Sequence, residues 1–323
     1  MSTRPWSEAR LHVVTGKGGT GKTTVAAALA LALAAGGRRT LVVEVEGRQG
    51  LAQLFDTPPL PYEERRIASA PGGGEVRALA VDVEEALLEY LAMFYNLRSA
   101  GRALRRMGAV DFATTIAPGM RDVLLTGKVK EAVTRTRQGH RVYDAVVLDA
   151  PPTGRITRFL NVTAEVAGLA KVGPIKTQSD GVMAVLRSPQ TAVHVVTLLE
   201  EMPVQETVDA VTELRAAHLP VGSVIVNMTR PPLLPEPALA AGRIDTGELR
   251  AGLAAAGLDA KLAPALAAEA VEHAERWQLE DDNRATLTGL DLPTIELPFL
   301  AGPVDLGGLY ELADLLRPDE VTA

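Results

Sequence analysis

The stretch that decides the fold is LHVVTGKGGTGKTTVAAALALALAA, which occupies residues 11–35. It opens with a β-branched run at Leu11–Thr15, continues into the glycine-rich GKGGTGKT at Gly16–Thr23, and ends in an Ala/Leu-rich run at Val25–Ala35. The central octet matches G-x-x-x-x-G-K-[ST], a pattern that cradles phosphate groups between a strand and a helix. Because the flanks have the composition of that strand and that helix, we expect a strand–loop–helix unit that binds a nucleotide.

The chemistry of the octet explains why it suits phosphate. Successive backbone N–H groups form a nest for anions, the helix start adds the positive end of its dipole, and glycine lets the chain curl without a Cβ clash. We expect Lys22 to neutralise the outer phosphates and the Thr23 hydroxyl to ligate Mg²⁺. A chance match is on the order of one in a hundred, so a glycine-rich turn without a ligand is the weaker interpretation. The residues expected to contact the phosphates are Gly16, Lys17, Gly18, Gly19, Thr20, Gly21, Lys22, Thr23 and Thr24.

Further β-branched runs alternate with helical segments along the chain. Their near-continuous apolar character is typical of strands buried on both faces, as in a parallel sheet covered by helices. We therefore predict an α/β fold of the P-loop NTPase type, in which a mostly parallel, doubly wound sheet carries helices on both faces and residues 1–323 form a single domain. The additional strands are expected at Thr40–Val45, Tyr143–Asp149, Ala192–Leu198, Val221–Asn227 and Pro293–Leu297.

Two helical regions interrupt this alternation. The first is a helical insertion at about residues 83–139, which follows an extra strand at Val76–Val81. The second is an Ala-rich helical segment at about residues 236–278. The helices expected within the insertion are Glu84–Phe94, Ala100–Met107 and Asp122–Arg137.

Composition excludes several classes of function. The chain has 33 Lys+Arg against 40 Asp+Glu, a formal net charge of −7, which disfavours nucleic acid as a partner. It has no cysteine, which excludes disulfides, thiolate zinc sites and iron–sulfur clusters, and its five histidines lack the spacing of metal ligands. The longest apolar run has 11 residues, against the ~20 that a membrane-spanning helix needs. We expect a cytoplasmic protein without stable membrane insertion.

A second lysine in the loop, Lys17, resembles the deviant phosphate loop of the MinD/ParA/ArsA superclass of ATPases. That resemblance implies a catalytic lysine that reaches across a dimer interface to the nucleotide of the partner subunit. An added cation at the transferred phosphoryl group would stabilise the charge of the transition state, as an arginine finger does. The alternative is that Lys17 is a solvated charge on the loop.

Asp149 ends a predicted strand, where it would lie beside the phosphate loop and help to hold Mg²⁺ through water. The segment that follows, DAPPTGRITRFL, resembles the switch II motif of ArsA-type ATPases at Asp149, Pro152, Thr153, Gly154, Arg158 and Leu160. The chain departs from the motif at Arg155 and Ile156, where the family has His and Thr. Whether Arg155 is a catalytic cation or a surface charge stays open.

Glu46 takes the position at which the ArsA pattern has an aspartate that orients the attacking water. A glutamate can play that catalytic role, but its carboxylate lies one methylene further out, and a displacement of about 1 Å can cost ~100-fold in rate. Slow hydrolysis, or nucleotide binding without hydrolysis, is therefore a second hypothesis. Glu46 could equally be an acidic residue at a helix start with no catalytic role.

The adenine site is implied by two segments near the C-terminus. Val224–Asn227 resembles the family's strand that ends in an adenine-contacting asparagine, whose amide matches donor and acceptor groups on the base. Leu297-Pro298-Phe299 resembles the segment that closes the other side of the base, which assigns Pro298 to the nucleotide site. Asn227 could alternatively cap a turn.

The resemblance covers essentially the whole chain and is nearest to actinobacterial ArsA/Get-like ATPases that occur as paired paralogous subunits. It implies a Mg²⁺–ATP-hydrolysing homodimer or heterodimer that couples nucleotide state to a protein client or a partner subunit. The alternative is a weakly hydrolysing regulatory or scaffold subunit that works with a paralogous ATPase. The lack of cysteine excludes an arsenite site and a zinc-stapled dimer of the kinds known in related branches.

Overall fold

The apolar runs of the sequence form the strands of one sheet. The computed structural model describes residues 6–95, 119–169, 174–235, 238, 242 and 244–317. Eight strands are hydrogen-bonded in the order β10-β9-β8-β1-β7-β2-β4-β3. Their bounds are β1 Leu11–Gly16, β2 Arg39–Glu44, β3 Arg65–Ala70, β4 Gly74–Ala80, β7 Ala145–Asp149, β8 Thr191–Thr197, β9 Val221–Thr229 and β10 Thr294–Pro298.

Parallel pairing at the centre of the sheet aligns the strand ends that carry the candidate site. β1 lies between β7 and β8, and β2 lies on the far side of β7. In this register Val14 pairs with Asp149, and Asp149 pairs in turn with Glu44. All residues of β1, β7 and β8 are buried, as their apolar character predicts. The phosphate loop and two acidic residues therefore meet at one edge of the sheet.

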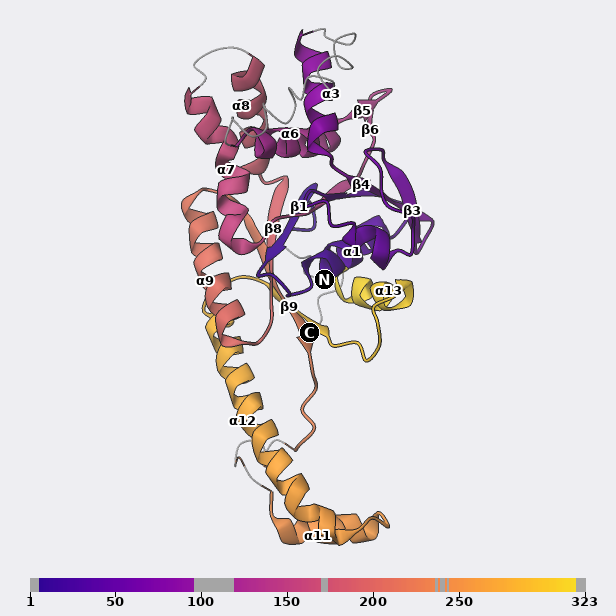
Figure 1. Cartoon of the computed structure of the whole chain (residues 1–323), viewed down its shortest axis with the longest axis vertical. Coiled ribbons are helices and arrows are strands. Elements are labelled where there is room, and N and C mark those ends of the chain that lie inside the picture. Colours follow the sequence, from indigo (N-terminus) through magenta and orange to yellow (C-terminus); the bar gives the residue numbers. More distant parts are fainter. Residues whose placement is uncertain are drawn as a thin grey trace.

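Helices cover both faces of the sheet, as the sequence predicts. On one face lie α1 (Lys22–Ala34), α2 (Gly50–Leu54) and α13 (Leu306–Leu315) (Figure 1). Each residue of α1 from Val25 to Ala34 is buried, which explains why this helix is apolar all round. The helices of the other face are α3 (Val83–Tyr95), α6 (Met120–Thr134), α7 (Thr153–Leu169), α8 (Pro174–Leu186) and α9 (Glu201–Ala216).

The sequence analysis missed the outermost strand and misplaced the end of α6. β3 pairs antiparallel with β4 through a tight turn at Pro71–Gly73. Its sequence, RRIASA, mixes arginine with small residues and so lacks a strand signal. The helix expected at Asp122–Arg137 ends at Thr134, because a small hairpin of β5 (Thr136–Arg137) and β6 (His140–Arg141) begins there. The helix expected at 100–107 lies outside the described residues.

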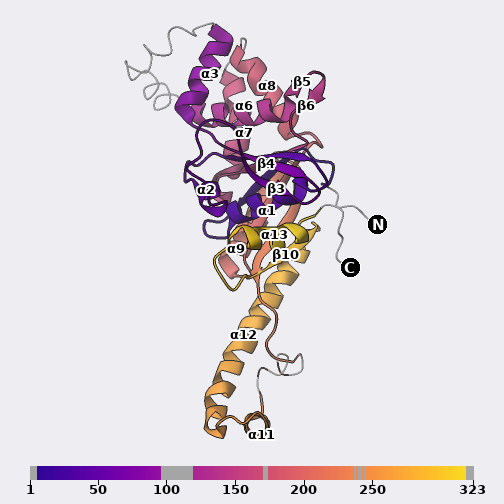
Figure 2. The ribbon, with the colours of Figure 1, turned by 90° about the vertical axis from the view of Figure 1, so that its right-hand side faces the viewer.

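A long helical arm leaves the body of the molecule beside the sheet. It consists of α11 (Thr246–Ala255), a short 3₁₀ turn (Ala260–Leu262) and α12 (Ala263–Thr288), with α11 at the distal end (Figure 2). α12 runs ten residues past the expected end at Gln278. Its C-terminal part is anchored by Arg284, which pairs with Glu296 at 2.9 Å. Within the part of the chain that the structure describes, no helix is both long and apolar enough to span a bilayer.

Two histidines form a buried network between the central strands. His12 on β1 and His194 on β8 stack with ring centroids 5.4 Å apart, and their Nδ1 and Nε2 atoms are 3.1 Å apart. His194 Nδ1 also contacts the Ser223 hydroxyl at 2.7 Å, and Trp6 packs edge-on against both rings. Burial lowers the pKa of His12 to about 4, and the network therefore favours the neutral form of the His12 ring.

This network predicts a loss of stability in mild acid. Because the pKa of His12 is lower in the folded than in the unfolded chain, its contribution is complete above pH 6.5 and is lost as the pH falls to about 4. The loss is on the order of 3 kcal/mol. Urea unfolding at pH 7 and pH 4 should show that wild type loses this much more stability than His12→Gln. Equal losses in the two proteins would contradict the assignment.

Candidate functional site

The loop between β1 and α1 curls so tightly that two of its glycines leave no room for a side chain. At Gly16 a Cβ atom would lie 2.2 Å from the carbonyl oxygen of Val196. At Gly21 the backbone has φ +84°, and a Cβ atom would lie 2.4 Å from Asn227 Nδ2. Gly18 and Gly19, by contrast, are exposed at the tip of the loop. The glycines thus serve close packing at the ends of the loop and open access at its centre.

The carbonyl oxygen of Lys17 organises the interior of the loop. It accepts hydrogen bonds from the Thr20 hydroxyl at 2.9 Å and from Lys22 Nζ at 3.4 Å. Lys22 is 8% exposed. Burial lowers the pKa of Lys22, while the charges of Asp149 and Glu46 act in the opposite direction. The ammonium group therefore lies under the loop among acidic residues, as the sequence analysis expects of a phosphate-binding lysine.

Thr23 and Asp149 come together at the junction of α1 and β7. The Thr23 hydroxyl donates to Asp149 Oδ2 at 2.8 Å. Asp149 is 7% exposed. Burial raises the pKa of Asp149 to about 6, the hydrogen bond from Thr23 lowers it, and the neighbouring Glu44 raises it again. Two oxygen ligands of the type that Mg²⁺ prefers are thus adjacent, in the arrangement expected from the sequence.

The loop after β2 is held by an acid that the sequence analysis did not single out. Glu44 is 2% exposed, and its carboxylate accepts backbone hydrogen bonds from Gln49 at 2.5 Å and Leu51 at 3.2 Å. It thereby fixes the start of α2 next to the phosphate loop. Glu46 lies in the same loop, where it pairs with Arg48 at 3.5 Å and influences the pKa of Lys22. The charge of Glu46 thus acts on Lys22, whereas the carboxylate of Glu44 is held by backbone N–H groups and its charge acts on Asp149.

Lys17 is engaged by a residue from another helix. Its Nζ atom lies 2.8 Å from Oε1 of Glu206 on α9. The other oxygen of this carboxylate, Oε2, accepts a hydrogen bond from the Thr153 hydroxyl at 3.1 Å. Thr153 is the first residue of α7, which directly follows the Asp149 segment. The sequence analysis did not predict these contacts of Glu206, because they arise only when α9 packs against α7 and the loop.

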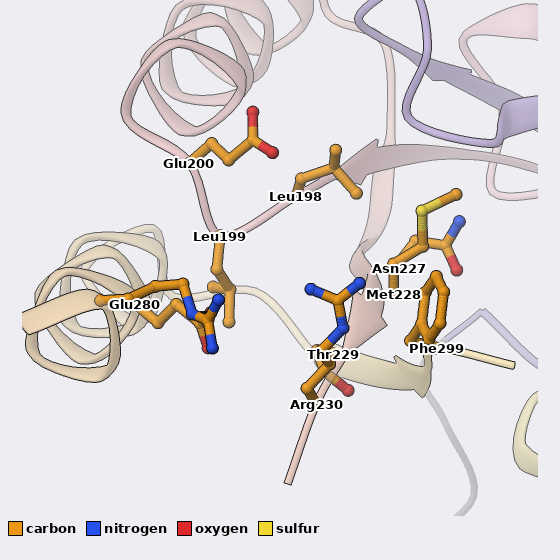
Figure 3. Close-up of a pocket in the computed structure, with 10 residues that line it drawn as sticks. Leu198, Leu199, Glu200, Asn227, Met228, Thr229, Arg230, Glu280 and Phe299 are labelled. Atoms are coloured by element: carbon orange, nitrogen blue, oxygen red, sulfur yellow. Dashed lines mark ion pairs between the residues drawn. The ribbon is translucent and has the colours of Figure 1, made fainter. Parts of the chain in front are cut away.

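A cavity of about 220 Å³ opens beside the phosphate loop (Figure 3). Asn227 lies on its wall, and the Asn227 Nδ2 atom donates to the backbone oxygen of Thr20 at 2.9 Å. Across the cavity mouth, the guanidinium of Arg230 stacks 4.3 Å from the ring centre of Phe299. Pro298, which the sequence analysis assigned to this site, ends β10, and the next residue, Phe299, lines the cavity.

Comparison with known proteins agrees with this geometry. A family model described as "Anion-transporting ATPase" (ArsA ATPase) matches residues 9–188, more than half of the chain. The chain belongs to the ArsA ATPase family. The matched residues include the phosphate loop, Glu46 and Asp149, whereas Asn227 and the helical arm lie beyond them.

Two relatives show how far the similarity extends. A Mycobacterium tuberculosis protein named "ATPase BagA" is 59% identical over 322 residues, which cover 98% of this chain and 94% of that protein. "Putative arsenical pump-driving ATPase 1" of Aquifex aeolicus is 31% identical over 159 residues, 47% of this chain and 38% of that protein. The comparisons thus place the phosphate loop, Glu46 and Asp149 in an ArsA-family ATPase domain.

The packed end and the exposed tip of the phosphate loop predict different effects of replacing a glycine. Gly21→Ala places a side chain at φ +84° and against Asn227, whereas Gly18→Ala meets open space. We expect Gly21→Ala to lower the free energy of unfolding by about 1–3 kcal/mol and Gly18→Ala to change it by less than about 0.5 kcal/mol. Chemical denaturation of both variants measures this difference. Equal stabilities would contradict the loop geometry.

Proposed function

We propose that the chain binds Mg²⁺–ATP at this sheet edge and hydrolyses it as one subunit of a dimeric ATPase, whose nucleotide state is coupled to a protein client or a partner subunit. The observation that carries the proposal is the Thr23–Asp149 hydrogen bond beside the buried ammonium of Lys22. The two oxygen atoms that would bind Mg²⁺ and the lysine that would bind a phosphate thus lie at the same loop. Membership in the ArsA ATPase family supports the choice of ATP chemistry.

The donor set at this edge fits magnesium. Thr23 and Asp149 would hold the ion, which when bound supplies positive charge to the phosphate oxygens. Among the described residues there is no group of three His, Asp or Glu side chains arranged to hold a metal. A hard cation that takes its other ligands from phosphate and water suits a site with only two protein oxygens.

The cavity beside the loop suits the base of the nucleotide. Asn227 gives one N–H to Thr20 and keeps Oδ1 and a second N–H, so that its amide can still pair with the amino and ring nitrogens of adenine. The stacked Arg230 and Phe299 lie at the cavity mouth, where a planar ring can pack against them (Figure 3). The hydrogen bond from Asn227 to Thr20 would fix the position of the base site relative to the phosphate loop.

The remaining charged residues divide the chemical tasks. Lys22 would neutralise the outer phosphates, and Lys17 would contact the nucleotide of the partner subunit. Glu46 would orient the attacking water as the general base candidate. The second lysine of the loop, Lys17, supports a dimer. Its side chain is partly exposed, so that it could reach a nucleotide bound to a facing subunit.

The alternative function is a weakly or non-hydrolysing nucleotide-binding subunit that regulates or scaffolds a paralogous ATPase. The ion pair of Glu46 with Arg48 favours it, because it directs the carboxylate toward a guanidinium rather than toward an attacking water. Turnover by the purified chain alone supports the first function. ATP binding without turnover, with activity restored by a paralogous subunit, supports the second.

The role of Lys22 predicts a large loss of ATP turnover in Lys22→Ala. Removal of one preorganised cation at the transferred phosphoryl group costs about 100-fold or more in rate. The matched control is Lys261→Ala, which removes a lysine from the distal end of the arm. Steady-state phosphate release measures both variants. Turnover of Lys22→Ala equal to that of the control would overturn the proposed site.

Glu46→Gln tests the water-orienting role separately from binding. The amide keeps the shape of the side chain but cannot accept a proton, so turnover should fall by about 100-fold while the affinity for Mg²⁺–ATP stays within about twofold. Calorimetric titration and phosphate release provide the two readouts. Unchanged turnover would show that Glu46 is an acidic residue of the loop without a catalytic task.

A further inference from the structure

Lys17 is held within its own subunit by Glu206. The 2.8 Å ion pair joins the ammonium group to α9, and both side chains are about one-third exposed. A partly exposed ion pair contributes little to stability, because water screens it and two long side chains lose freedom. Such a contact can hold Lys17 near α9, yet it is weak enough for a phosphate to replace Glu206 as the partner of the ammonium group.

The same carboxylate also holds the start of α7. The Thr153 hydroxyl, which is buried, donates to the second oxygen of Glu206 at 3.1 Å. Thr153 follows Asp149 by four residues and begins the helix that carries Arg155. The charge of Arg155 in turn acts on Asp122 at the start of α6. The Glu206 side chain therefore connects the phosphate loop to α7.

We infer that Glu206 is a positioning residue for Lys17, which retains the lysine in its own subunit and competes with a nucleotide phosphate for the ammonium group. The inference rests on the proposed function, in which Lys17 contacts a nucleotide. A triphosphate carries more negative charge than one carboxylate, so it can displace Glu206. After displacement, the Glu206 carboxylate would keep only its hydrogen bond from Thr153. The position of Lys17 is therefore linked to the start of α7.

The chain contains a matched control for this carboxylate. Thr157 on α7 donates to Glu213 on α9 at 3.1 Å, so the same two helices are joined by a second hydroxyl–carboxylate pair. Glu213 lies seven residues, about two helical turns, beyond Glu206 and away from the phosphate loop. Glu206→Gln and Glu213→Gln both keep an acceptor for their threonine. They differ in that only the first removes the charge beside Lys17.

The test is a double-mutant cycle on the full chain with Mg²⁺–ATP as the probe. Calorimetric titration gives the affinity for ATP, and sedimentation gives the dimer fraction, for wild type, Lys17→Ala, Glu206→Gln, the double variant and Glu213→Gln. We expect Glu206→Gln to raise ATP affinity by about two- to fivefold, with a larger dimer fraction. Glu213→Gln should match wild type. In the Lys17→Ala background, Glu206→Gln should have no effect.

The remaining outcomes separate the inference from the function on which it rests. If wild type fails to bind ATP, or if Lys17→Ala matches it in both readouts, the proposed role of Lys17 fails. If Lys17→Ala is impaired but Glu206→Gln equals Glu213→Gln, the role of Glu206 alone is overturned. The same holds if Glu206→Gln weakens binding, or if its gain persists without Lys17, since a persistent gain reflects only the loss of a negative charge near the phosphates.

Discussion

The hydrogen bond between the Thr23 hydroxyl and Asp149 is the contact on which the site depends. It joins two segments that are 126 residues apart in the sequence. It can form only because β1 and β7 are parallel neighbours whose ends lie in register, with Val14 opposite Asp149. Once the sheet fixes that register, the start of α1, the phosphate loop and the segment leading into α7 share one location. The proposed chemistry follows from this convergence.

Electrostatics at this edge explains why a divalent cation belongs to the proposed function. Three carboxylates lie close together here. The charges of Asp149 and Glu46 act to raise the pKa of Lys22, and the charges of Glu44 and Glu46 act to raise the pKa of Asp149. A nucleotide that arrived alone would add negative charge to a region already rich in it. Mg²⁺ bound between Asp149 and the phosphates would remove that repulsion. In the proposed function, the acidic surroundings of Lys22 would therefore make nucleotide binding depend on the metal.

The parts of the site that the sequence predicts are those with local causes. The glycine pattern, Lys22 and Thr23 depend on backbone geometry within one loop, and Asp149 is marked by its place at the end of an apolar strand. The contact of Glu206 with Lys17 depends on the packing of α9 against α7, which the sequence alone does not report. Likewise, the Ala-rich helical segment was expected to end at about Gln278, yet α12 continues to Thr288, and within it Arg284 packs on Trp277 and pairs with Glu296. Tertiary contacts, rather than local composition, decided both cases.

The most direct test of the central claim is the Mg²⁺ dependence of ATP binding in wild type and in Thr23→Val. Valine keeps the shape of threonine and removes the hydroxyl that contacts Asp149. Calorimetric titration with ATP in Mg²⁺ and in chelator should show that the metal strengthens binding to wild type by about tenfold or more, a gain of at least about 1.4 kcal/mol. Thr23→Val should lose most of that gain and retain its metal-free affinity. An equal gain from Mg²⁺ in both proteins would contradict the account.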